Sequence, residues 1–421
     1  MTMAPDSRPP PPNPPLPPAQ IRRQGPRPLG LHLGMGMGVL LSLPPALPFL
    51  RANSLPLARS LRDRGAALAA DLAASPADDL ARAVDREMRR RLDRFLTGIE
   101  RYRRHPYRRD LDDPPVAWRE GRTRLLDHGG PADGPVVLFV PSLVNRGYIL
   151  DLSARKSLVR DLAARGLRVF LLDWGAPGPM ERGFTLTDVI DGRLVRALAA
   201  VSRAAGGRRI TIAGYCMGGL LALAAATARP DLVERFVALA TPWDFHADDP
   251  AGAARIAALL PGFEPILRLL GELPVDGIQS LFATLDPLLA LKKFSRFARL
   301  DPDGAEAEEF VALEDWLNDG VTLPAAVARE CLEGWYGANT PGRGEWRVGG
   351  HRIDPAALSL PALVVVPARD RIVPPASARA LGERIPGAEI RTPPLGHIGM
   401  IVSGAAREKV WDPLADWLLS R

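Results

Sequence analysis

The stretch Ile210-Thr211-Ile212-Ala213-Gly214-Tyr215-Cys216-Met217-Gly218-Gly219 decides the fold. It opens with apolar, β-branched residues typical of a buried strand, and the Leu- and Ala-rich run 220–229 behind it predicts a helix. Glycines stand two positions to either side of Cys216, where side chains would collide with neighbouring backbone in a sharp turn. The stretch therefore predicts a strand, a strained turn and a helix in direct succession.

This pattern matches the nucleophile elbow, G-x-S-x-G, with Cys216 in place of the serine. The dipole of the following helix favours a thiolate at Cys216, and the backbone N–H of Met217 can donate to an oxyanion. A buried structural cysteine in a glycine-rich turn is the alternative interpretation of the motif alone. A thiol that attacks a thioester gives another thioester, so the acyl group stays activated, and the cysteine favours acyl transfer over hydrolysis.

Outward from this stretch, apolar runs alternate with helical patterns. Helices are expected at 156–165 and 187–204, and strands at 136–140, 169–172, 236–239, 362–366 and 389–391. Such an alternation builds βαβ units with right-handed crossovers. We therefore predict an α/β fold of the α/β-hydrolase type, with a mostly parallel sheet flanked by helices.

Two further residues complete a candidate triad by their order in the chain. Asp370 follows the strand at 362–366, and His397 follows the strand at 389–391. Hydrolases of this fold place nucleophile, acid and base in this order, at the carboxyl ends of strands. We therefore predict that Cys216 is the nucleophile, His397 the base and Asp370 the acid.

Two other carboxylates and one loop complete the candidate site. Asp244 also follows a strand and is the rival acid, but Asp370 is preferred because it has the better strand before it and the Val-Pro-Pro turn behind it. Asp173 is less favoured still. The second oxyanion donor should be a backbone N–H at Val144 or Asn145, in the loop after the first core strand. No cofactor and no metal is expected.

The chain divides into four parts. Residues 1–28 are rich in proline and should be disordered. Residues 29–117 form a helical N-terminal extension, in which Met88, Leu92, Phe95, Leu96 and Ile99 should share one face. Residues 118–243 and 361–421 form the α/β core. The insertion 244–360 should fold as a helical cap subdomain, with some of its apolar residues between Leu259 and Leu288 lining a channel to Cys216.

The core sequence resembles that of the polyhydroxyalkanoate synthases, especially the two-component type (class III), whose catalytic subunit works with an accessory subunit. The resemblance rests on six segments: 141–152, 172–175, the G-x-C-x-G-G box at 214–219, 241–245, 370–375 and 396–404. It implies that Cys216 carries the growing chain, served by His397 and Asp370, and that (R)-3-hydroxyacyl-coenzyme A is the acyl donor. A thioesterase, esterase or depolymerase with the same triad is the alternative, and a scaffold with a relic site is the third.

The composition of the chain indicates the cellular compartment and the kinds of partner to expect. The chain has 421 residues, a net charge of +6 and two cysteines, which fit neither a disulfide framework nor a zinc site. We expect a cytoplasmic protein without nucleic-acid contacts. Residues 29–50 carry no charged side chain, and we expect them to pack on the core or to meet a polymer granule or membrane surface. An accessory synthase subunit and a homodimer both remain open as partners.

Overall fold

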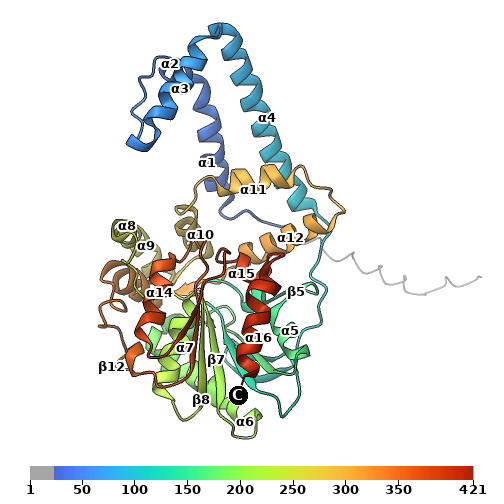
Figure 1. Ribbon diagram of the computed structural model, residues 1–421, viewed down its shortest axis with the longest axis vertical. Helices are drawn as coiled ribbons and strands as arrows, with labels where there is room; N and C mark the ends of the chain where they lie inside the picture. The colour runs from blue at the N-terminus through green and yellow to red at the C-terminus, as the bar shows by residue number, and fades with distance from the viewer. Residues whose placement is uncertain (1–22, 421) are drawn as a thin grey trace, which may run out of the picture.

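The computed structural model describes residues 23–420 and contains one large twisted sheet with helices on both faces (Figure 1). Its eight strands lie in the order β1-β2-β6-β3-β7-β8-β13-β14. Their bounds are β1 Val116–Glu120, β2 Thr123–Asp127, β3 Val136–Val140, β6 Arg168–Asp173, β7 Ile210–Tyr215, β8 Val233–Leu239, β13 Ala362–Val365 and β14 Glu389–Arg391. The six strands from β6 to β14 pair in parallel, whereas β1 and β2 are antiparallel. The predicted α/β-hydrolase fold is confirmed.

The sheet separates two hydrophobic cores because successive side chains of a strand point to opposite faces. Val136, Leu138 and Val140 of β3 face one core, and Val137 and Phe139 face the other. The first core is covered by α6 (Val195–Ala204), α7 (Met217–Ala228) and α14 (Pro375–Arg384), and the second by α5 (Leu158–Ala164), α15 (Gly399–Val402) and α16 (Asp412–Leu419). Because these strands are buried on both faces, their sequences are continuous apolar runs.

The hairpin of β1 and β2 was not predicted. Half of the residues in its strands are polar or charged, including Arg, Glu and Asp, because one side of an edge hairpin faces water. Three helical segments have π-type turns, which leave no local sequence signal: η4 Asp188–Leu194, η5 Glu330–Gly337 and η7 Arg407–Trp411. Short 3₁₀ turns are η1 Arg59–Leu61, η2 Gly147–Leu150, η3 Glu181–Gly183 and η6 Pro355–Ala357.

The insertion 244–360 is mainly helical. Its helices are α8 Pro250–Ala257, α9 Leu260–Leu270, α10 Val275–Ala283, α11 Leu289–Phe297, α12 Ala305–Asn318 and α13 Ala325–Arg329. Three small strand pairs lie outside the main sheet: β4 Asp151–Ser153 with β5 Lys156–Ser157, β9 Glu272–Leu273 with β10 Leu323–Pro324, and β11 Arg347–Val348 with β12 His351–Arg352. In Figure 1 these helices lie along the edge of the sheet from which the N-terminal helices project.

The N-terminal helices form an arm that stands away from the sheet (Figure 1). The arm comprises α1 (Leu29–Leu41), α2 (Leu43–Arg51), α3 (Arg62–Ala73) and α4 (Ala77–Arg104). Its base is a third apolar cluster in which Phe95, Ile99 and Tyr102 of α4 pack against α11 and α12. Met88 is also buried, but Leu96 is 42% exposed, so the face predicted for α4 is narrower than expected.

The Pro-rich segment predicted to be disordered lies mostly outside the described residues. Its last part, residues 23–28, lies against the cap rather than free of it, because Arg23 and Arg27 have partners there. Arg23 pairs with Asp315 at 2.7 Å, and the backbone N–H of Arg27 donates to Asn318 Oδ1 at 2.8 Å. Polar contacts at a buried boundary therefore hold a stretch whose composition alone suggests no structure.

Candidate functional site

Cys216 occupies the turn between β7 and α7, with a backbone conformation of φ 56° and ψ −131°. A residue with a side chain rarely adopts this left-handed region, and such strain persists only where the surroundings enforce it. The backbone N–H of Cys216 donates to the carbonyl of Leu239 at the end of β8. The thiol itself remains partly exposed at the N-terminus of α7. The turn therefore has the geometry of a nucleophile elbow, with Cys216 at the position of the nucleophile.

The glycines of this turn are required by close packing. A Cβ atom at Gly214 would overlap the backbone of Gly219, and one at Gly218 would overlap the carbonyl oxygen of Val140 on β3. A Cβ at Gly219 would overlap the side chain of Thr241 at the end of β8. The box thus lets α7 approach three strand ends closely, which is the reason given above for its glycines.

His397 and Asp370 form a buried pair. Nδ1 of His397 lies 2.7 Å from Oδ2 of Asp370, and both residues are almost fully buried. The other oxygen of Asp370, Oδ1, accepts hydrogen bonds from the backbone N–H groups of Ile372 and Val373 at 2.8 and 2.9 Å. The turn after β13 therefore fixes the carboxylate, and the carboxylate fixes the orientation of the imidazole.

The imidazole of His397 also lies close to the side chain of Cys216. Burial lowers the pKa of His397, but the negative charge of Cys216 and hydrogen bonds to Asp370 and Cys216 outweigh it and raise the pKa to about 10. Tyr215 stacks near the imidazole, with 5.2 Å between ring centroids, and its hydroxyl donates to the carbonyl of His397 at 3.1 Å. The structure thus brings Cys216, His397 and Asp370 together.

The rival carboxylates have other partners. Oδ1 of Asp244 accepts hydrogen bonds from the side chain of Asn339 at 2.8 Å and from the backbone N–H of His246 at 2.9 Å. Asp173 pairs with Arg124 at 2.6 Å. Among the described residues, only Asp370 accepts a hydrogen bond from His397, so the geometry favours Asp370 over both alternatives.

The predicted oxyanion donors differ in whether their N–H groups already have a hydrogen-bond acceptor. Within residues 23–420 the backbone N–H groups of Met217 and Asn145 have no hydrogen-bond acceptor, whereas that of Val144 donates to Oγ of Ser142 at 3.3 Å. The Asn145 side-chain nitrogen is also buried without a partner in the described part of the chain. Of the two residues predicted in this loop, Asn145 has the more available donors.

The cap holds this loop in place, a contact that the sequence did not indicate. Asn145 forms an isolated antiparallel bridge with Gly320, and the N–H of Val321 donates to the carbonyl of Val144 at 3.2 Å. Nε1 of Trp316, at the end of α12, donates to the carbonyl of Arg146 at 2.7 Å. Because the loop is bound to the cap, movement of the cap would move the candidate oxyanion donors.

Aromatic side chains of the cap lie close to the elbow. Phe245 stacks on Trp335 with 5.8 Å between centroids and meets Tyr336 edge-on at 5.0 Å. Burial raises the pKa of Tyr336, and the nearness of Cys216 raises it further, so its phenol lies within electrostatic range of Cys216. Cys216 itself is partly buried and packs against both of the hydrophobic cores that flank the sheet. The surroundings of the thiol are therefore largely apolar.

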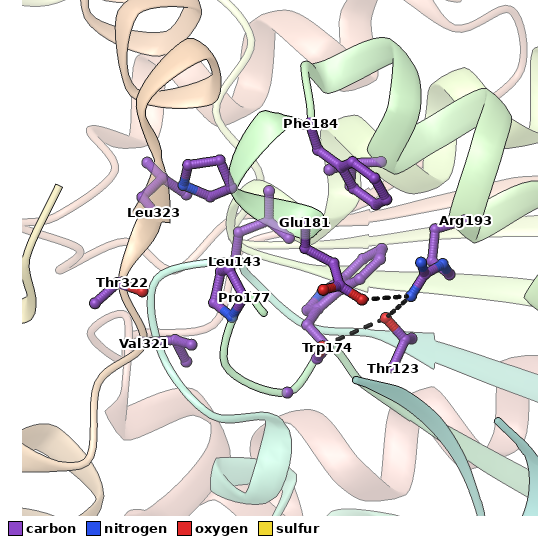
Figure 2. Close-up of a pocket in the computed structure, with 13 residues that line it drawn as sticks. Thr123, Leu143, Trp174, Pro177, Glu181, Phe184, Arg193, Val321, Thr322 and Leu323 are labelled. Carbon is purple, nitrogen blue, oxygen red and sulfur yellow. Dashed lines mark hydrogen bonds and ion pairs between the residues drawn. The ribbon is translucent and has the colours of Figure 1, made fainter. Parts of the chain in front are cut away.

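Neither of the two pockets found beside these elements is lined by Cys216. Figure 2 shows the first, between Leu143 and the cap segment 321–324, where Arg193 bonds to Thr123 and pairs with Glu181. Its volume of about 40 Å³ suits a few water molecules and no acyl group. The second, about 480 Å³, adjoins Ala224 and Ala228 near the far end of α7, some 12–18 Å along the helix from Cys216.

Several cap residues predicted to line a channel have different environments. Phe263, Leu281 and Phe282 are partly buried in the same core that Cys216 touches. Leu259 and Ile266 are exposed by 40% and 36%, and Leu269 is 81% exposed. Among residues 23–420, no three His, Cys, Asp or Glu side chains are grouped as metal ligands would be.

Comparison with known proteins gives a matching family model and several similar proteins. A family model described as the alpha/beta hydrolase fold matches residues 135–403, a range that includes Cys216, Asp370 and His397. The chain is 32% identical to the poly(3-hydroxyalkanoate) polymerase subunit PhaC of Synechocystis sp., over 68% of this chain and 78% of the relative. It is 30% identical to that of Allochromatium vinosum, over 70% of this chain and 83% of the relative. A solved thioesterase domain from the curacin biosynthetic pathway is 16% identical, with a TM-score of 0.43, over 71% of this chain and 95% of that one.

Proposed function

The chain belongs to the poly(3-hydroxyalkanoate) polymerase family and has the α/β-hydrolase fold, and we propose how its residues carry out the polymerisation. The enzyme is an acyltransferase that joins hydroxyacyl units into a polyester. In our proposal it takes (R)-3-hydroxyacyl-coenzyme A, holds the acyl group on Cys216, and needs no separate cofactor. The observation that carries this assignment is the strained Cys216 turn beside the buried His397–Asp370 pair.

The first step forms the acyl-enzyme. The Cys216 thiolate attacks the thioester carbonyl, and the resulting oxyanion accepts hydrogen bonds from the N–H groups of Met217 and Asn145. The bond from carbon to the coenzyme A sulfur then breaks. His397, whose pKa of about 10 keeps it protonated at neutral pH, gives its proton to the leaving sulfur.

The second step uses the change in charge at Cys216. Once acylated, Cys216 no longer carries the negative charge that helped to raise the pKa of His397, so the neutral imidazole becomes a base. It takes the proton from the 3-hydroxyl group of another hydroxyacyl unit, whose oxygen attacks the Cys216 thioester. An ester forms, the thiolate is released, and His397 is again protonated beside it. Asp370 stabilises the imidazolium and holds its tautomer.

Polymerisation rather than hydrolysis requires that water be kept from the acyl-enzyme. The aromatic residues Phe245, Trp335 and Tyr336 and the partly buried Phe263 support this role for the cap. We further propose cytoplasmic activity, since the thiol must stay reduced. An accessory subunit and a second copy of the chain are the two candidate partners, which light scattering during turnover, with and without added subunit, would separate.

Incubation with (R)-3-hydroxybutyryl-coenzyme A tests the proposal. The purified chain should release coenzyme A and form insoluble polymer, and the Cys216→Ala variant should do neither. Release of coenzyme A with 3-hydroxybutyrate as the only acyl product would replace the polymerase by the alternative hydrolase. Equal activity of the Cys216→Ala variant would remove the assignment of the nucleophile.

A further inference from the structure

The tip of the N-terminal arm has features of a lipid-binding surface. We define the arm tip as residues 39–73, which comprise the end of α1 and all of α2 and α3 (Figure 1). Five of its large apolar side chains are exposed, namely Val39, Leu41, Phe49, Leu61 and Leu68, with Phe49 exposed by 56%. Within the described chain, the cap segment 259–289 exposes a similar number of large apolar side chains.

The apolar segment behind this tip is long but interrupted. Leu29–Arg51 spans 23 residues and is apolar enough to cross a membrane, and only 17% of its most apolar 18-residue window is buried. Ser42 marks a turn between α1 with 13 residues and α2 with 9, but its backbone stays helical and its carbonyl accepts a hydrogen bond from the N–H of Ala46. The prolines of α2, Pro44, Pro45 and Pro48, remove backbone N–H donors from the second half, so the segment is better suited to lie in the interface than to cross a bilayer.

The charges of the tip identify what it contacts. Residues 39–73 contain four arginines and two aspartates. Arg59, Arg62 and Arg64 are exposed and, within residues 23–420, have no ion-pair partner. On the exposed part of α4, which we call the shaft of the arm, Arg82 pairs with Asp79 and Arg89 pairs with Asp85. Uncompensated cations thus lie beside exposed apolar side chains at the tip.

From this juxtaposition we infer that the arm tip binds an anionic phospholipid surface, with Phe49 and Leu41 in the acyl region and Arg59, Arg62 and Arg64 on lipid phosphates. A polyester surface has no anionic groups along its chains and offers the arginines only neutral ester carbonyls. A tip-to-tip contact between two copies would bring their net positive charges together. An anionic lipid layer satisfies both the apolar and the cationic residues.

The arm would also set the distance of the catalytic core from that surface. The 28 residues of α4 span about 42 Å from the tip to the cap, where Phe95, Ile99 and Tyr102 anchor the helix. Intrahelical pairs such as Arg91 with Glu87 support the exposed shaft. The core would thus work above the lipid rather than in it. This inference does not rest on the catalytic assignment.

Co-sedimentation of the full chain with lipid vesicles tests the inference. Vesicles with phosphatidylglycerol should bind the chain, vesicles of phosphatidylcholine alone should bind it much more weakly, and high salt should release it. The triple variant Arg59→Gln/Arg62→Gln/Arg64→Gln should partition about 100-fold more weakly, since each arginine near an anionic surface contributes roughly fivefold. The matched shaft variant Arg82→Gln/Arg89→Gln/Arg90→Gln loses the same charge and should lose little binding.

A second variant, Phe49→Ser, removes an exposed side chain without a structural role and should also weaken binding, while thermal melting and coenzyme A release without vesicles stay unchanged. Equal binding to both vesicle types, or equal losses in the tip and shaft variants, would overturn the inference. So would binding to lipid-free polymer particles but not to vesicles, or self-association through the tip in the absence of lipid.

Discussion

The elbow around Cys216 and the helix around Cys331 hold the two cysteines of the chain in opposite surroundings. Cys216 sits on a strained turn, partly exposed, at the start of α7 and beside His397. Cys331 lies in η5, and its burial, together with the charge of Glu330, raises the pKa of its thiol. In our proposal the same side chain is a nucleophile in one region and an inert core residue in the other.

The comparison teaches that backbone and neighbours, not the residue type, decide reactivity. The left-handed φ of Cys216 aims the sulfur outward at a helix N-terminus, and a histidine with its own carboxylate stands beside it. Cys331 lies among apolar neighbours, and the charged group that acts on its thiol is the carboxylate of Glu330, which disfavours the thiolate. Tyr336, in the same helix η5, is close enough to Cys216 for its charge to act.

The largest expected difference is in turnover after removal of each thiol. Cys216→Ala should lower polymerisation by about 10⁴-fold or more, since no other group holds the acyl chain. Cys331→Ala should leave kcat within about twofold and cost about 1 kcal/mol of stability through a small cavity. Coenzyme A release and a denaturant titration measure both. Similar losses in the two variants would erase the distinction.

A smaller effect should follow from the two carboxylates near the elbow. Asp370→Asn should lower kcat by about 10³-fold, because the amide cannot stabilise the His397 imidazolium although its oxygen can still accept from Ile372 and Val373. Asp244→Asn should cost far less, since Asp244 bonds Asn339 and the backbone instead. Steady-state kinetics of both variants gives the ranking, and the reverse order would move the acid to Asp244.

Much of this site could be predicted because its signals are local. The glycines around Cys216 reflect close packing that any elbow requires, Asp370 follows the apolar strand β13, and His397 follows the short strand β14. The bridge of Asn145 to Gly320 could not be predicted, because two loops 175 residues apart carry no shared pattern. The β1–β2 hairpin was missed for another reason: its outward face is charged, which hides the strand periodicity.

Alkylation should separate the cysteines by about 100-fold at neutral pH. Iodoacetamide reacts with thiolates, and Cys216 is partly exposed while Cys331 is buried with a raised pKa. Peptide mapping of the folded protein at short times should find carbamidomethyl at Cys216 almost alone. In denaturant the two rates should become similar, which serves as the control, and equal labelling in the folded state would contradict an activated Cys216.

The smallest effect concerns the cap contact behind the elbow. Trp316→Phe leaves the carbonyl of Arg146 without its donor and should lower kcat about 10-fold by loosening the loop of Asn145, with KM and the alkylation rate of Cys216 little changed. Tyr102→Phe removes a hydrogen bond to Asp315 on the same helix α12 but facing the arm, and should leave kcat unchanged. Equal kcat in the two variants would limit Trp316 to a structural role.

The most direct measurement is mass spectrometry of the protein quenched in acid during turnover of (R)-3-hydroxybutyryl-coenzyme A. We predict one or more hydroxybutyryl units attached to the peptide that contains Cys216. The adduct should be absent in the Cys216→Ala variant, accumulate in Asp370→Asn, and never appear on Cys331. Turnover without any Cys216 adduct in the quenched protein, or an adduct on another residue, would contradict the account.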